Sequence, residues 1–306
     1  MKINGVIVRV PAKINLQLAV GPLGADGFHE VTTVFQAISL YDEVSVRYGE
    51  TGQGIQLSVS GPTAPGVPVD STNLAVRAAE LMVARYDLAS DLSIHLKKEI
   101  PVAGGMAGGS ADAAGVLVGI DSLFELGLSR DDLERIAAEL GSDVPFSISG
   151  GIAIGTGRGD RITPALSRGN YLWVLALSGH GLSTPAVYKE CDRLREGMQI
   201  ARPYISEAMM QALRAGDPKA LGKALANDLQ PAACSLRPAL RLVLDVGMEY
   251  GALGGIVSGS GPTVAFLVAD EEKSLDLTVA LSASGVVAGV IRASGPTHGA
   301  RVIETL

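Results

Sequence analysis

A run of glycines in the first half of the chain constrains the fold more than any other stretch. Four glycines fall within six residues of Pro101-Val-Ala-Gly-Gly-Met-Ala-Gly-Gly-Ser110, and the segment that follows is apolar and rich in alanine. The preceding segment, Leu92–Ile100, begins with apolar residues at alternate positions, which is typical of a half-buried strand. Strand, glycine loop and helix in this order predict an anion site, because the first N–H groups of a helix lack partners and glycines let a ligand approach them. Ser110 is expected to cap the helix.

The loop alone leaves its function open. Glycine clusters are more often flexible connections or close packing points between a helix and a strand than ligand sites. Neither G-x-x-x-x-G-K-[ST] nor G-x-G-x-x-G occurs in the sequence, so a bound nucleotide would use neither a Walker loop nor a Rossmann turn. Phosphate binding is therefore a hypothesis that the rest of the chain has to support.

Composition narrows the class of protein. The 306 residues are 47% hydrophobic and 19% charged, which predicts a packed globular protein with room for two domains. A formal net charge of −7 argues against a general binder of nucleic acid or anionic membranes, although a small phosphorylated ligand needs only local positive potential. We expect free thiols and no zinc site, because no metal-ligand spacing connects the cysteines and histidines (Cys191, Cys234, His29, His95, His180 and His298).

Two segments bear on the location of the protein. The N-terminal Met1-Lys-Ile-Asn-Gly-Val6 lacks the apolar core of a signal peptide. The long, weakly polar window 102–120 is a poor membrane span because it contains the glycine cluster and Asp112. The expectation is a soluble cytoplasmic protein.

Strand and helix patterns alternate along the whole chain, which predicts an α/β or α+β fold in two domains, residues 1–163 and 164–306. In the first half we expect strands at 6–18, 31–40, 42–48, 55–60, 92–100 and 150–157, and helices at 73–86, 110–120 and 129–140. In the second half we expect strands at 171–177, 255–258, 264–268 and 285–292, and helices from Thr184-Pro185 onward and near 205–215, 218–228, 236–250 and 271–283.

Three motifs together identify a family. They are Pro11-Ala-Lys-Ile-Asn-Leu16, the glycine loop from Pro101 to Ala111, and Gly255-Ile-Val-Ser-Gly-Ser-Gly-Pro-Thr263. In sequence and spacing this chain resembles the GHMP kinases. Ala25-Asp-Gly-Phe-His-Glu30 and Leu140-Gly-Ser-Asp-Val-Pro-Phe146 are most similar to the branch whose acceptor is a small polyol joined to cytidine diphosphate.

The resemblance implies a fold and a phosphoryl donor. It implies an N-terminal domain like ribosomal protein S5, a C-terminal ferredoxin-like domain, and an active site in the cleft between them. ATP with Mg²⁺ would bind there, with Ser110 a possible contact for the metal and no metal ligands otherwise assigned. The residues implied to bind ATP are Asn73, Pro101, Val102, Ala103, Gly104, Gly105, Met106, Ala107, Gly108, Gly109, Ser110 and Ala111.

The same resemblance implies a catalytic pair. Asp143 matches the aspartate that accepts the proton of the acceptor's hydroxyl, and Lys13 would lie beside it and keep it ionised. Taken alone, Asp143 is better explained as a helix cap or a surface acid, because Pro145 biases Val144 away from the helical region and leaves Asp143 on an irregular segment. Asn73 is similarly explained almost as well as a residue that starts a helix.

Four further residues match the acceptor site of this branch. His29 is implied to bind the cytosine edge, Tyr188 to stack on the base, and Asn15 to contact the substrate. Phe28 stands where many relatives carry tyrosine, so a hydroxyl contact is missing there and the implied role is apolar packing or stacking.

The sequence alone leaves other functions possible. Another small-molecule kinase of this family, of the homoserine or phosphomevalonate type, is the nearest alternative, followed by a decarboxylase of the same fold and a catalytically silent nucleotide-binding protein. We expect the protein to bind its small-molecule acceptor and neither nucleic acid nor membranes. We expect it to be a monomer or a weak homodimer.

Overall fold

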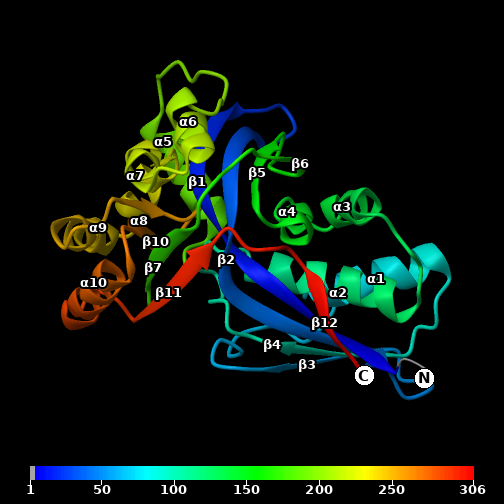
Figure 1. The fold of residues 1–306 in the computed structure, drawn as a ribbon. Helices are drawn as coiled ribbons and strands as arrows, with labels where there is room; N and C mark the ends of the chain where they lie inside the picture. Colours follow the sequence, from blue (N-terminus) through cyan, green and yellow to red (C-terminus); the bar gives the residue numbers. More distant parts are fainter. Residues whose placement is uncertain (1–3) are drawn as a thin grey trace.

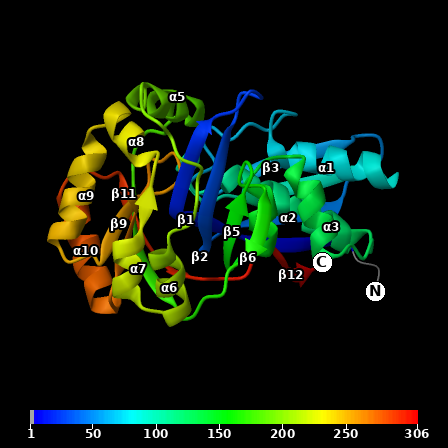
Figure 2. The same ribbon diagram turned by 90° about the horizontal axis from the view of Figure 1, so that it is seen from above.

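The chain builds two β-sheets with helices packed against each (Figure 1). This computed structural model describes residues 4–306. Met1, Lys2 and Ile3, which belong to the N-terminal segment considered for an export signal, lie outside the described residues. Seen from above, the long strands β1 and β2 stand between the helices of the C-terminal half and those of the N-terminal half (Figure 2).

The larger sheet has eight strands within the described residues, and its main path is β12-β1-β2-β4-β3. The long antiparallel pair β1 and β2 extends beyond this path, so β5 pairs with the far part of β2, β6 with β5, and the short β8 with β1. The strands are β1 (Gly5–Leu23), β2 (His29–Tyr48), β3 (Ile55–Ser60), β4 (Leu92–Lys97), β5 (Ile152–Thr156), β6 (Arg161–Pro164), β8 (Ala226–Asn227) and β12 (Arg301–Thr305).

Four helices of the first half pack around this sheet: α1 (Leu74–Tyr86), α2 (Gly108–Leu123), α3 (Arg130–Ala138) and α4 (Val144–Ser149). Helix α2 is nearly all buried, and it contacts β1, β2, α1, α3 and α4. The glycine loop leads directly into α2, so the position of the loop is set by the packing of this helix.

The smaller sheet has the order β11-β7-β10-β9 and consists of β7 (Tyr171–Leu177), β9 (Gly254–Val257), β10 (Val264–Val268) and β11 (Gly289–Gly295). The helices of the second half are α5 (Thr184–Leu194), α6 (Glu207–Ala215), α7 (Pro218–Ala224), α8 (Gln230–Leu236), α9 (Ala239–Glu249) and α10 (Glu271–Ala283). One apolar core includes residues of both sheets, which ties the two halves together.

Most expected elements are present, and several bounds differ. The strands expected at 31–40 and 42–48 are one strand, β2, whose pairing with β1 is interrupted by irregularities in register. The helix expected at 218–228 ends at Ala224 because the chain there pairs with β1 as β8, and α8 follows. Strand β11 begins at Gly289 instead of 285.

The C-terminal strand β12 was not expected and joins the N-terminal sheet beside β1.

The division of the chain into two domains near residue 163 stays a prediction. In residues 4–306 no helix combines the length and the apolar character needed to cross a membrane.

We expect Gly115→Ala to destabilise the protein by roughly 1–3 kcal/mol, the usual cost of overpacking a core. A Cβ at this position on α2 would lie 2.5 Å from Cγ2 of Val44 and 3.0 Å from Cγ2 of Val10. Chemical unfolding measures the effect. Gly109→Ala is the matched control, because its nearest heavy atom would be 3.9 Å away. Equal stabilities for the two variants would contradict the close approach of α2 to the sheet.

Candidate active site

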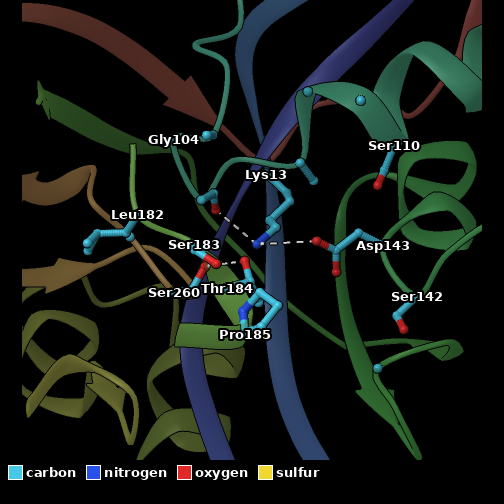
Figure 3. A pocket seen from close by; sticks show the side chains of 18 of the residues that line it. Lys13, Gly104, Ser110, Ser142, Asp143, Leu182, Ser183, Thr184, Pro185 and Ser260 are labelled. Carbon is cyan, nitrogen blue, oxygen red and sulfur yellow. Dashed lines mark hydrogen bonds and ion pairs between the residues drawn. The ribbon is translucent and has the colours of Figure 1, made fainter. Parts of the chain in front are cut away.

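A cavity of about 1070 Å³ lies where the two halves of the chain meet. Its walls come from β1, the glycine loop, the start of α2, the segment before α4, the start of α5 and the turn between β9 and β10. Figure 3 shows Lys13 and Asp143 pointing toward each other in this cavity, with Ser110 above them and Thr184 and Ser260 on the opposite wall. The three sequence motifs are therefore brought together in space.

The backbone of the glycine loop is folded tightly. Ala103 and Ala107 have positive φ angles of 52° and 59°, and Ala107 immediately precedes α2. Gly105 has a φ of +77°, and a Cβ there would lie 2.2 Å from the carbonyl oxygen of Ser258. Only glycine fits at position 105, because the third motif passes directly against it.

The carbonyl of Gly105 joins all three motifs. It accepts a hydrogen bond of 3.0 Å from Nζ of Lys13 and another of 3.0 Å from Oγ of Ser258. The backbone N–H of Thr263 donates to the carbonyl of Gly104 at 3.3 Å. The third motif thus supports the loop from the second half of the chain.

Lys13 is held in one place by its neighbours in β1. It is 5% exposed, and its Nζ donates to Oδ1 of Asn15 at 2.7 Å. Nδ2 of Asn15 donates to Oγ1 of Thr33 at 2.8 Å, and that hydroxyl donates to the carbonyl of Gln17 at 2.7 Å. This chain of hydrogen bonds fixes which way the Asn15 amide faces, so Asn15 positions Lys13 as well as lining the cavity.

Asp143 faces Lys13 across the cavity. Its Oδ2 lies 3.6 Å from Nζ of Lys13, and its side chain is 33% exposed. Asp143 lies in a turn, as expected, but the expectation that Pro145 keeps Val144 out of a helix is wrong. Val144 begins the short helix α4 (Val144–Ser149), and Pro145 is in its first turn, where a missing N–H is tolerated. Asp143 precedes this helix but makes no capping hydrogen bond with its side chain, so a capping role does not account for the carboxylate.

His29 and Tyr188 meet at one side of the cavity. Their ring centroids are 5.1 Å apart, and Nε2 of His29 lies 2.8 Å from Oδ1 of Asp192. Burial, with a smaller effect from the negative charge of Asp143, raises the pKa of Tyr188 to about 12, so its hydroxyl keeps its proton at neutral pH. Asp192 was missed from the sequence, although it follows Tyr188 by four residues and hence lies one helical turn along α5.

Phe28 is also at the cavity wall, and it carries an unexpected partner. Phe28 is 51% exposed, and the guanidinium carbon of Arg158 lies 3.7 Å from the centroid of its ring. Arg158 also pairs with Asp26 at 3.1 Å. No pattern in the sequence links Arg158, in the turn between β5 and β6, to the loop that carries Phe28.

The residues predicted to bind ATP form two groups, those that line the cavity and those that are buried in the core. Asn73 lines the cavity. So do nine residues of the loop, namely Pro101, Val102, Ala103, Gly104, Gly105, Ala107, Gly108, Gly109 and Ser110. Met106 and Ala111 are completely buried in the apolar core instead, so their side chains serve packing.

Ser110 is not the helix cap that was expected. Helix α2 begins two residues earlier, at Gly108, and its N-cap position is Ala107. The hydroxyl of Ser110 is therefore not used as a cap and lies at the cavity. Asn73 both lines the cavity and caps α1, since its Oδ1 accepts from the N–H of Ala75 at 2.8 Å.

A buried cluster of charges lies beside the loop. Nζ of Lys98 donates to Oδ2 of Asp112 at 2.6 Å and to Oδ2 of Asp42. Oδ1 of Asp112 is buried and has no hydrogen-bond partner among the described residues. Burial raises the pKa of Asp112 to about 7, against the lowering effect of Lys98. Across residues 4–306, no group of three or more His, Cys, Asp or Glu side chains is arranged to hold a metal ion.

Comparisons with known proteins place the chain in a family. The family models for the GHMP kinases N terminal domain and the GHMP kinases C terminal match residues 73–151 and 209–300. A protein of Streptomyces coelicolor named 4-diphosphocytidyl-2-C-methyl-D-erythritol kinase is 52% identical over 299 residues, which is 98% of this chain and 99% of that protein.

Two solved structures are also similar. A crystal structure of 4-(cytidine 5'-diphospho)-2C-methyl-D-erythritol kinase is 30% identical, with a TM-score of 0.73 over 94% of this chain and 98% of that one. A homoserine kinase from Cytophaga hutchinsonii has a TM-score of 0.76 and covers 98% of each chain, but at 18% identity it shows a shared fold alone.

We expect Asp112→Asn to gain stability relative to the unchanged protein as the pH rises from 5 to 8. The folded-state pKa of Asp112 lies above its unfolded value, so the proton that it binds stabilises the folded state in acid, and this contribution is lost as the pH rises toward 7. The difference in unfolding free energy between the two proteins should shift by at least about 1 kcal/mol, since one pKa unit corresponds to 1.36 kcal/mol.

Urea unfolding at several pH values measures this shift. Asp131→Asn, at an exposed position on α3, is the control and should differ from the unchanged protein by the same amount at each pH. A pH-independent difference for Asp112→Asn would contradict the raised pKa.

Proposed function

The chain belongs to the GHMP kinase family, and from that premise we propose that it transfers the γ-phosphoryl group of ATP to the 2-hydroxyl of 4-diphosphocytidyl-2-C-methyl-D-erythritol. The products are the 2-phosphate and ADP, in the non-mevalonate route to isoprenoid precursors. Relatives of that name match nearly the whole chain, with 52% identity in one of them. The observation that carries the proposal is the approach of Lys13 to Asp143, 3.6 Å apart in the cavity that the glycine loop borders.

Asp143 acts as the general base. As the acceptor oxygen forms its bond to the γ-phosphorus, the bond from that phosphorus to the bridging oxygen of ADP breaks, and the hydroxyl proton passes to the carboxylate of Asp143. Its exposed fraction leaves the carboxylate accessible from the cavity. Proton transfer to a positioned group of this kind contributes about 10²–10⁴-fold to a rate.

Lys13 orients the reacting groups and balances charge. The Asn15 amide and the Gly105 carbonyl hold its ammonium group at a fixed place facing Asp143. A fixed positive charge in a cavity stabilises the negative charge that develops on the transferred group and on the acceptor oxygen. Because the glycine loop contains no lysine, Lys13 supplies from β1 the cation that the loop lacks.

ATP lies with its phosphates along the glycine loop. The N–H groups at the start of α2 and the helix dipole favour an anion there, and Asn73 borders the adenine end. A Mg²⁺ ion bound to the nucleotide supplies further charge neutralisation for the phosphates. Ser110 borders the cavity, and its hydroxyl is an oxygen that would contact this ion.

The cytidine end of the acceptor occupies the side of the cavity formed by His29, Tyr188 and Phe28. A base needs a flat surface and hydrogen-bonding groups at its edge, and Tyr188 and His29 supply these from one cluster. The contact with Asp192 holds the His29 ring in a fixed orientation toward the base. The guanidinium of Arg158 covers one face of the Phe28 ring. We place the reaction in the cytoplasm, where ATP is available and the free thiols of Cys191 and Cys234 persist.

An ADP-release assay on a panel of acceptors tests the substrate. The cytidine diphosphate of methylerythritol should turn over with ATP and Mg²⁺, while homoserine and phosphomevalonate should not. Turnover of only one of the other alcohols would contradict the proposed acceptor. ADP release with none of them, despite ATP binding, would favour a silent nucleotide-binding protein.

We expect Asp143→Asn to lower kcat by at least ~10²-fold, because the variant keeps the shape of the side chain and loses the base. Steady-state kinetics with both substrates measure this, and the KM values should change little. Asp131→Asn on α3 is the control. A kcat near that of the unchanged protein would exclude Asp143 from the proton transfer.

For Tyr188→Ala we expect the KM of the cytidine substrate to rise about tenfold, since stacking of a base on an aromatic ring is worth about 1–3 kcal/mol. The KM for ATP should stay the same. Tyr188→Phe keeps the ring and is the matched control, with a KM close to that of the unchanged protein. An unchanged KM in Tyr188→Ala would exclude stacking on this ring.

A further inference from the structure

An exposed loop at the acceptor side of the cavity is held from outside by one side chain. Residues 24–28 join β1 to β2 and are all exposed, so no buried side chain anchors this loop in the core. Within residues 4–306, Arg158 is the one side chain beyond the loop that forms a hydrogen bond with it. A segment with few buried contacts is easily displaced, so its position depends on the contacts that Arg158 makes.

Arg158 holds Phe28 in two ways. Its guanidinium lies over one face of the ring, with 3.7 Å between the guanidinium carbon and the ring centroid, where a cation is attracted by the electrons of the ring. Its Nη2 also donates to Oδ2 of Asp26 at 3.1 Å, and Oδ1 of the same carboxylate accepts from the backbone N–H of Phe28 at 3.1 Å. Both the ring and the backbone of Phe28 are therefore fixed through Arg158.

Arg158 itself belongs to a turn that is tied to the larger sheet. The turn joins β5 to β6, and β5 pairs with β2. The backbone N–H of Arg158 donates to Oδ1 of Asp160 at 3.0 Å, and the carbonyl of the preceding Gly157 accepts from the N–H of Val31 in β2 at 2.8 Å. The turn thus gives the guanidinium a defined origin, from which it braces the exposed loop.

Phe28 still has a surface to offer to a ligand. The residue is about half exposed and lines the cavity together with His29, Tyr188 and Arg158. Because the guanidinium covers one face of the ring, the opposite face is the one available for stacking. A planar base gains most from an aromatic ring when the two faces meet at a fixed distance and tilt.

We propose that Arg158 is a positioning residue for the acceptor, which holds Phe28 so that the free face of its ring meets the cytosine base. This inference depends on the proposed acceptor. Arg158 acts on the base through Phe28 and does not contact the phosphates of the acceptor. Loss of Arg158 leaves Lys13 and Asp143 in place, so it weakens binding of the acceptor without slowing the chemical step.

Steady-state kinetics of Arg158→Ala test this separation. We expect the KM of the cytidine substrate to rise about three- to tenfold, the size expected for losing an exposed ion pair and an exposed cation–π contact. The kcat and the KM for ATP should not change, because a change in KM alone indicates lost binding and not lost chemistry. Arg161→Ala removes the same charge from an exposed position in β6 outside the cavity lining, and it should match the unchanged protein.

A double-mutant cycle with Phe28→Ala shows whether Arg158 acts through the ring. If it does, adding Arg158→Ala to Phe28→Ala should raise the KM of the cytidine substrate by less than about twofold, because the ring that Arg158 positions is already gone. Effects that multiply in the double variant would overturn the proposal, since they would indicate that Arg158 contacts the acceptor independently of Phe28.

Inhibition by cytidine and by cytidine diphosphate, each measured against the acceptor, separates the base from the phosphates. Both inhibition constants should rise by the same factor in Arg158→Ala. A rise for cytidine diphosphate alone would overturn the proposal and indicate a phosphate contact. An unchanged KM in Arg158→Ala would overturn this inference alone. Failure of the unchanged protein to phosphorylate the cytidine substrate would overturn the proposed function, and this inference with it.

Discussion

The carbonyl oxygen of Gly105 is the point on which the site depends. It accepts hydrogen bonds from Lys13 in the first strand and from Ser258 in the turn between β9 and β10, so three distant segments meet at one atom. The approach is possible only because residue 105 has no side chain. The loop is thereby held from both halves of the protein, and the same contact places the Lys13 ammonium group opposite Asp143.

Two buried lysines, Lys13 and Lys98, border the cavity, and their hydrogen-bond partners give them different roles. Lys13 has neutral oxygen partners in Asn15 and Gly105, and its carboxylate neighbour Asp143 is 3.6 Å away and partly exposed, so its positive charge acts on the cavity. Lys98 lies between two buried carboxylates, so its charge is used within the protein to anchor the start of α2. Their positions in strand patterns do not distinguish the two lysines, because the difference comes from partners far away in the sequence.

Local sequence patterns predicted the elements whose bounds depend on local chemistry. Helix α3 has a serine cap with acids in its first turn and appears where expected, and the fully apolar strand β7 does as well. The errors are at places where a distant partner decides the structure. The chain after Ala224 leaves its helix to pair with β1, β2 continues through its irregularities because β1 runs beside it, and β12 is a strand because the edge of β1 is available.

The sequence by itself determined the family and the mixed α/β architecture. The family can be identified because its three motifs have a characteristic residue content and spacing along the chain. It also identified Lys13, Asp143, His29 and Tyr188, which the structure brings to one cavity. Only the tertiary structure decided that Met106 and Ala111 pack into the core and that Asp192 and Arg158 border the cavity. It also decided that Asp112 is a buried carboxyl, one oxygen of which has no hydrogen-bond partner within residues 4–306. These properties depend on burial and on contacts between distant segments, and neither is encoded in the spacing of residues along the chain.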